Sequence, residues 1–118
     1  MTQPIALVVD DEPDICELIE ITLMRMGVQT RSAGDLAQAR AQLRDQRFDL
    51  CFTDMRLPDG NGIELVREIG REHAELPVAM ITAHGNMETA VEALKAGAFD
   101  FVSKPVDLEI LRKLVDKA

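Results

Sequence analysis

Short apolar runs alternate with segments of helical periodicity along the whole chain. Residues 5–9 form a continuous apolar run, which is typical of a strand covered on both faces. Pro13 then suits the first turn of a helix, whose apolar positions recur at helical spacing as far as Gly27. Four further strand-like runs lie at 29–33, 50–53, 78–81 and 99–102. A segment with helical spacing follows each of them, and residues 57–62 are expected to form a turn between the run 50–53 and its helical segment.

Capping residues and glycines mark the ends of these helical segments. Asp35 and Asp107 each precede an apolar periodic segment and suit helix N-caps, whereas Gly97 suits a helix stop. The run 29–33 is more polar than the others, so we expect it at an edge of the sheet. Five strand–helix units in succession predict an α/β domain, with a doubly wound five-stranded parallel sheet between two layers of helices.

The composition is that of one globular domain over residues 1–118. Hydrophobic residues make up 47% and charged residues 29% of the chain, and the formal net charge is −8. A surface this acidic repels nucleic acid, so direct binding to DNA or RNA is not expected of this segment. Cys16 and Cys51 lack metal-binding spacing, and no apolar run reaches membrane-spanning length. Reduced thiols and the absence of a signal-peptide pattern predict a cytoplasmic protein.

Polar side chains suited to chemistry follow the predicted strands where they end. The chain places such residues after four of the five runs: Asp10 and Asp11, Asp54, Thr82, and Lys104. Parallel sheets bind ligands at the carboxyl ends of their strands, so these residues are expected at one edge of the sheet. Taken singly, each has an ordinary alternative, since Asp and Thr cap helices and Lys is usually a surface residue.

The grouping of these residue types predicts a magnesium-dependent phosphoryl-transfer site. Three clustered carboxylates repel one another unless a cation neutralises them. Carboxylate oxygens suit Mg²⁺, which takes one or two protein carboxylates and keeps several waters. One carboxylate can then act as the nucleophile, with Thr82 and Lys104 holding the phosphoryl oxygens.

The same residues lie within motifs that resemble the signature of response-regulator receiver domains. The motifs are Val8-Val9-Asp10-Asp11-Glu12, Thr53-Asp54-Met55-Arg56-Leu57-Pro58-Asp59-Gly60, Ile81-Thr82-Ala83 and Lys104-Pro105. The resemblance covers essentially the whole chain and implies a flavodoxin-like fold with strand order 2-1-3-4-5. It also implies a two-component switch that catalyses only its own phosphotransfer and dephosphorylation, rather than an enzyme.

The resemblance assigns a role to each residue of the site. It makes Asp54 the phosphoacceptor, while Thr82 and Lys104 hold the phosphoryl oxygens. The implied ligands of Mg²⁺ are Asp11, Asp54, the backbone carbonyl of Arg56 and, through water, Asp10.

Two further features follow from the resemblance near the last strand. The peptide bond between Lys104 and Pro105 is implied to be cis. Phe101 takes the position of the aromatic residue that switches together with Thr82. Without the family match, Phe101 would simply be a core residue of the last strand.

Two stretches narrow the resemblance to receivers of the NtrC group. They are Ile81-Thr82-Ala83-His84-Gly85 and Lys95-Ala96-Gly97-Ala98-Phe99-Asp100-Phe101, while 54–60 is similar to the pilin-regulating PilR branch. Such receivers precede a sigma-54-activating ATPase domain and a DNA-binding helix-turn-helix, so the chain is expected to be the N-terminal fragment of a transcription regulator. The implied partners are a sensor histidine kinase, these downstream domains and, in a homodimer, a second receiver.

Two hypotheses concern residues outside the core motifs. Arg56 and His84 each lie two residues after a site residue, and we expect them to influence the lifetime of the phosphorylated state; the alternative is that both are exposed rim residues without a kinetic role. Met87, Val91 and Leu94 are expected to contribute to a signalling surface, although Val91 and Leu94 could instead cover the sheet.

Other classes of protein fit the sequence less well. A phosphatase with a strand-end nucleophile needs a second acid two residues later, where this chain has Arg56. A nucleotide-binding fold needs a glycine-rich loop after the first strand, where this chain has Asp10-Asp11-Glu12-Pro13. A receiver that acts only as a phosphorylation-independent interaction module would be expected to lack Asp11, Asp54 or Lys104, and all three are present.

Overall fold

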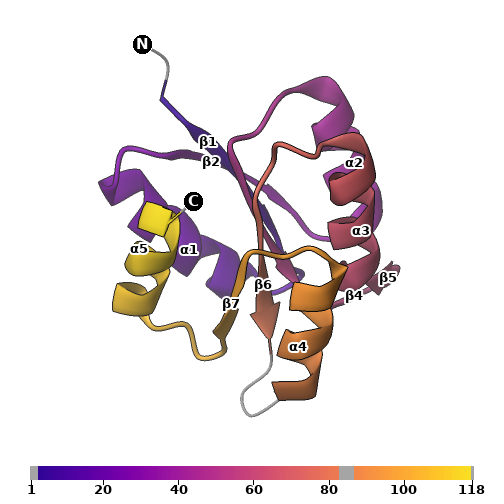
Figure 1. Ribbon diagram of the computed structural model, residues 1–118. Coiled ribbons are helices and arrows are strands. Elements are labelled where there is room, and N and C mark those ends of the chain that lie inside the picture. Colours follow the sequence, from indigo (N-terminus) through magenta and orange to yellow (C-terminus); the bar gives the residue numbers. More distant parts are fainter. Residues whose placement is uncertain (1–2, 83–86, 118) are drawn as a thin grey trace.

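The computed structural model describes residues 3–82 and 87–117, and within them it contains one five-stranded parallel sheet flanked by helices (Figure 1). The strands of this sheet are β1 (Ile5–Val9), β2 (Gln29–Ala33), β3 (Leu50–Asp54), β6 (Val78–Thr82) and β7 (Asp100–Ser103). The helices are α1 (Pro13–Arg25), α2 (Leu36–Asp45), α3 (Gly62–Glu72), α4 (Met87–Ala96) and α5 (Leu108–Lys117). The sheet order is β2-β1-β3-β6-β7, which confirms the predicted doubly wound order with the polar strand β2 at an edge.

The sheet separates two hydrophobic cores. In Figure 1, α1 and α5 lie on one side of the sheet, and α2, α3 and α4 lie on the other. Along β1, Ala6 and Val8 join the core beneath α1 and α5, whereas Leu7 and Val9 join the core beneath the other three helices. All four side chains are fully buried, which explains why this strand is apolar without alternation. Within the described residues, no helix combines the length and apolar character that crossing a bilayer requires.

Helix α4 contacts the sheet through small side chains. Its buried residues are Ala90 and Ala93, while Met87 is 65%, Val91 43% and Leu94 41% exposed. The interpretation in which Val91 and Leu94 cover the sheet is therefore wrong. Alanine methyl groups let the helix lie close to the strands, and the larger apolar side chains of α4 then point toward solvent.

Two local features differ from those predicted. The last strand begins at Asp100 rather than at residue 99, since its pairing with β6 starts with Asp100 beside Ala79. The Phe99 N–H bonds to the Val78 carbonyl (2.9 Å) one residue before this ladder. Residues 57–62, expected as a turn, lie mostly in a short antiparallel hairpin of β4 (Arg56–Leu57) and β5 (Gly60–Asn61). The hairpin joins β3 to α3, and the side chain of Asn61 caps α3 by accepting a bond from the Ile63 N–H (2.8 Å).

Gly62 closes the base of this hairpin against β3. Its N–H bonds to the Met55 carbonyl at 2.7 Å, and its Cα lies so close to the backbone of Asp54 that an added Cβ would overlap the Asp54 carbonyl oxygen. The same Cβ would lie 3.2 Å from the hydroxyl oxygen of Thr53. Only a residue without a side chain lets the chain turn from β5 into α3 at this distance from β3.

An ion pair joins α2 to α3 on the outer side of the sheet. The guanidinium of Arg40 donates two hydrogen bonds to the carboxylate of Glu68, at 2.7 and 2.9 Å, and lies 3.9 Å from Glu64. The hydrogen bonds from Arg40 hold the pKa of Glu68 below its ordinary value. A group with a depressed folded pKa stabilises the fold above its unfolded pKa and loses that contribution as the pH falls through the folded value.

Glu68→Gln should therefore lower the free energy of unfolding by about 0.5–1 kcal/mol at neutral pH, and the difference from wild type should disappear in strong acid. Urea denaturation at a series of pH values measures this. Glu64→Gln is the matched control, because Glu64 is farther from the same guanidinium, and it should change stability less. A loss that persists unchanged in strong acid would contradict this account.

Gly62→Ala should lower the free energy of unfolding by about 1–3 kcal/mol, because the backbone of β3 or of α3 must shift to admit the methyl group. Gly70→Ala is the control within the same helix: its Cβ would meet no atom within 4 Å, so it should stabilise the protein by about 0.5–1 kcal/mol. Denaturant titration of both variants gives the comparison. Equal stability of the two variants would contradict a steric conflict between a side chain at position 62 and the backbone of Asp54.

Candidate functional site

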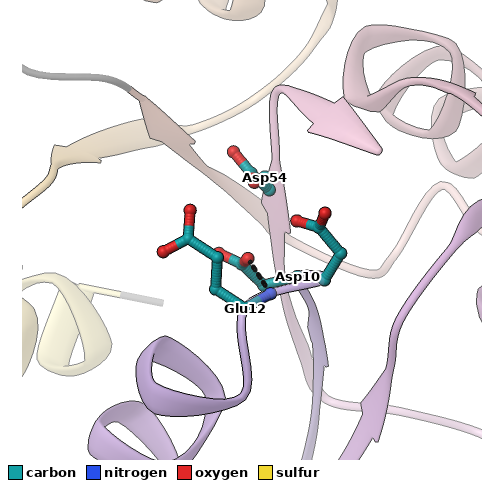
Figure 2. A group of neighbouring side chains, drawn as sticks. Asp10, Glu12 and Asp54 are labelled. Carbon is teal, nitrogen blue, oxygen red and sulfur yellow. Dashed lines mark hydrogen bonds between the residues drawn. The ribbon is translucent and has the colours of Figure 1, made fainter. Parts of the chain in front are cut away.

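Carboxylates from two neighbouring strands meet at the carboxyl edge of the sheet. Strands β1 and β3 are parallel partners with Val9 beside Thr53, so Asp10 after β1 and Asp54 at the end of β3 come together. Asp11 and Glu12 follow in the turn that leads to α1. One carboxylate oxygen from each of these four residues lies within 4.8 Å of the others, and Figure 2 shows Asp10, Glu12 and Asp54 converging.

Asp10 is fixed in place by the turn that it begins. Its N–H bonds to the Ala33 carbonyl of β2 at 3.0 Å, and its Oδ1 accepts a bond from the Glu12 N–H at 2.9 Å, drawn as the dashed line in Figure 2. The thiol of Cys16, on the first turns of α1, donates to its carbonyl at 3.3 Å. One oxygen of Asp10 thus holds the turn before α1 and the second remains for the site. Helix α1 has Glu12 as its N-cap residue and no side-chain cap bond, so Asp10 does not cap this helix.

Lys104, which comes from the end of β7, contacts the same group of acids. It follows β7, and its N–H bonds to the Thr82 carbonyl of β6 at 2.8 Å. Its ammonium nitrogen lies 3.3 Å from Asp10 Oδ2, 3.1 Å from Glu12 Oε1 and 3.2 Å from Asp54 Oδ2, with the side chain 18% exposed. Burial opposes the charged ammonium, but its hydrogen bond to the Glu12 carboxylate and the attraction of Asp10 and Asp54 raise the pKa of Lys104 above its ordinary value.

One ammonium does not balance this group of acids. Burial, reinforced by the neighbouring charge of Asp54, raises the pKa of Asp10 to about 6. The buried Asp10 Oδ2 has Lys104 as its ion-pair partner but accepts no hydrogen bond from the described residues. An under-bonded carboxylate oxygen among an excess of acids is what a hard divalent cation needs, so the residues present fit a metal ion of that kind.

The acids open into a hollow that the hairpin helps to enclose. The hollow has a volume of about 550 Å³ and is lined by Asp11, Glu12, Asp54, Met55, Arg56, Asn61, Thr89 and Lys104. Arg56 is exposed and lies opposite Asn61 in the β4–β5 pairing. Asp54 is 7% exposed, so a ligand in the hollow can reach its carboxylate.

The structure also shows where the remaining predicted features lie. Thr82 is 1% exposed at the last position of β6, and Phe101 is partly buried against the core beneath α2, α3 and α4. The Lys104–Pro105 peptide bond is cis. His84 lies outside the described residues.

Sequence reasoning missed two contributors to the site. Glu12 is one of the four converging acids and an ion-pair partner of Lys104, although only Asp10 and Asp11 received roles. Its place in an unbroken run of three acids was the available signal. Asn61 lines the hollow because the hairpin folds back, and a turn prediction for 57–62 contained no sign of that pairing.

Comparison with known proteins agrees with this geometry. Residues 6–116 match the family described as the response regulator receiver domain. The response regulator protein PilR of Pseudomonas aeruginosa is 60% identical over 118 residues, which are 100% of this chain and 26% of that protein. The nitrogen assimilation regulatory protein NtrX of Azorhizobium caulinodans is 44% identical over 114 residues, or 95% of this chain and 25% of that protein. The chain thus spans about a quarter of the length of these curated relatives.

A solved structure extends the match to three dimensions. The receiver domain of NtrX from Brucella abortus has a TM-score of 0.90 and 42% identity, with 95% of each chain covered. Fold, strand-end acids and sequence therefore agree over nearly the full chain. The chain belongs to the response regulator receiver domain family and is similar to the receivers of NtrC-type regulators.

Proposed function

We propose that this domain is a magnesium-dependent phosphorylation switch in which Asp54 accepts a phosphoryl group. The donor is the phosphohistidine of a sensor kinase or a small acyl phosphate. The observation that carries the proposal is the position of Asp54, which lies at the floor of an open hollow between an excess of acids and the ammonium of Lys104. A phosphoryl group needs compensating positive charge on its oxygens and a nucleophile in line with the leaving group, and this arrangement can supply both.

Asp11, Asp54 and the carbonyl of Arg56 would hold the ion, with Asp10 acting through water. When bound, Mg²⁺ supplies positive charge to the carboxylate cluster and to the incoming phosphoryl oxygens. An Asp54 carboxylate oxygen attacks phosphorus, the bond from phosphorus to the donor imidazole nitrogen breaks, and that nitrogen keeps the electron pair. Lys104 moves from the Asp54 carboxylate to a phosphoryl oxygen, and the hydroxyl of Thr82 donates to another.

The reaction is self-limited, so the domain acts as a switch rather than as an enzyme for other substrates. Water attacks the phosphorus of the acyl phosphate, the bond to the Asp54 oxygen breaks, and inorganic phosphate leaves. Between these events, Thr82 moves toward the phosphoryl group and Phe101 changes its position in the core. A few kcal/mol of differential contact is enough to shift such a two-state equilibrium.

The switch is read by partners on the exposed face of α4. Met87, Val91 and Leu94 form an apolar group there, which is the kind of surface that protein partners cover. The longer relatives support an output region beyond this domain, which we infer to be a sigma-54-activating ATPase and a DNA-binding helix-turn-helix in a cytoplasmic transcription regulator. A second receiver in a homodimer can use the same face.

Incubation with acetyl phosphate should add a single phosphoryl group, visible by intact mass, only when Mg²⁺ is present. Asp54→Asn should abolish the adduct, because the amide is not a nucleophile for phosphorus, while Asp45→Asn, an exposed control at the end of α2, should not. An adduct on Asp54→Asn would place the acceptor elsewhere. A wild-type protein that binds Mg²⁺ but forms no adduct with acetyl phosphate or with a phosphorylated kinase would favour a phosphorylation-independent interaction module.

Arg56→Ala should shorten the lifetime of the phosphorylated protein several-fold. The exposed cationic side chain lines the hollow, and its removal opens a path for the hydrolytic water. Phosphate release from the isolated phosphoprotein measures the rate, with Arg56→Lys keeping the charge and less of the bulk. Equal rates for wild type, Arg56→Ala and His84→Ala would contradict a role for these two positions.

A further inference from the structure

The hairpin between β3 and α3 is tied to a helix that is distant in sequence. At its tip, Asp59 Oδ1 accepts a hydrogen bond from the Leu36 N–H at 2.8 Å, and Oδ2 accepts one from the Ala37 N–H at 3.0 Å. These are free donors of the first turn of α2, at the positive end of its dipole. The charge and both oxygens of Asp59 are therefore used to attach the hairpin to α2.

Side-chain packing reinforces the same attachment. A Cβ on Gly60 would lie 2.6 Å from Cδ1 of Leu36, so the hairpin backbone rests directly on the first residue of α2. Leu57, at the other side of the hairpin, is 8% exposed and belongs to the same core as Leu36. The tip is thus held by two charged hydrogen bonds and by apolar contact.

Helix α2 does not need Asp59 as its N-cap. Helix α2 already has an N-cap in Asp35, whose Oδ1 accepts a bond from the Gln38 N–H at 2.8 Å. The two carboxylates serve different donors of the same helix, but only Asp59 belongs to the segment that encloses the hollow. Asp35 is local to α2, whereas Asp59 lies 23 residues from Leu36 along the chain.

The attachment determines where Arg56 lies. The hairpin has two anchors, Gly62 against β3 at the base and Asp59 on α2 at the tip, and Arg56 lies between them in β4. Arg56 lines the hollow together with Asp11, Glu12 and Asp54, so a displacement of β4 would change where its backbone lies relative to these acids. With the tip released, β4 and β5 would be held at the base alone.

We propose that Asp59 is a positioning residue for the switch, which holds the hairpin on α2 and so keeps the carbonyl of Arg56 in place to complete the cation site. The role rests on the proposed magnesium-dependent function. Groups that orient metal ligands without touching the metal typically contribute 10–100-fold to its affinity, so the loss of Asp59 is expected to weaken Mg²⁺ binding by about tenfold.

The experiment compares Asp59→Ala with Asp35→Ala in the whole chain. Both variants lose a carboxylate cap of α2, and both should unfold at a lower temperature than wild type. The rate of phosphorylation by acetyl phosphate is measured against Mg²⁺ concentration. Asp59→Ala should need about tenfold more Mg²⁺ for half its maximal rate and should keep a nearly normal rate at saturating Mg²⁺, while Asp35→Ala should keep the wild-type requirement.

Asp59→Asn keeps one acceptor oxygen and covers the case in which the alanine variant does not fold. Its Mg²⁺ requirement should lie between those of wild type and Asp59→Ala. An unchanged requirement in a folded Asp59 variant, with a thermal shift like that of Asp35→Ala, would overturn the positioning role and leave the switch intact. Wild-type protein that takes no phosphoryl group at any Mg²⁺ concentration would overturn the proposed function itself, and the positioning role with it.

Discussion

Three carboxylates share the ammonium of Lys104. Two of them lie between β1 and α1, and the third is at the end of the central strand β3. Lys104 lies within 3.1–3.3 Å of Asp10, Glu12 and Asp54, and its link to Glu12 joins residues that are 92 positions apart. Partly buried charges persist in a protein only where they are paired, so the ends of β1, β3 and β7 are held together by this contact. The acids nevertheless outnumber the cation. That surplus creates the need for a metal ion and for a ligand whose arrival can release Lys104.

The rest of the fold keeps these ends in register. Strands β1, β3 and β6 are almost entirely buried between two helical layers, so the residues that follow them have little freedom to move. The hairpin and α4 lie at the periphery of this rigid sheet. The acids at the ends of β1 and β3 are thus placed by the sheet itself, whereas the hairpin depends on its own anchors at Gly62 and Asp59.

Most of the fold follows from local patterns, and the site follows from topology. Apolar runs with helical segments between them are enough to predict the five parallel strands, and parallel strands bring their final residues to one edge. Two kinds of contact could not be predicted. Some join residues that are far apart along the chain, and others bury small side chains where larger apolar ones nearby are the expected core residues. Asp59 meets α2 only because the hairpin folds over it, and no periodicity signals such a contact. In α4, Val91 and Leu94 look like core residues, yet the alanines are buried instead.

The alanine face of α4 has an energetic consequence for the layer in which it lies. Helix α3 is anchored by Ile63, Leu65, Val66 and Ile69, whose branched side chains interlock with the sheet, whereas the buried residues of α4 are Ala90 and Ala93. Each buried methylene contributes about 0.8 kcal/mol, so α4 has far less attachment energy per turn than its neighbour. A surface of methyl groups also lacks the ridges that lock helices against sliding. Sideways displacement of α4 therefore exposes less buried side-chain surface than the same displacement of α3 would.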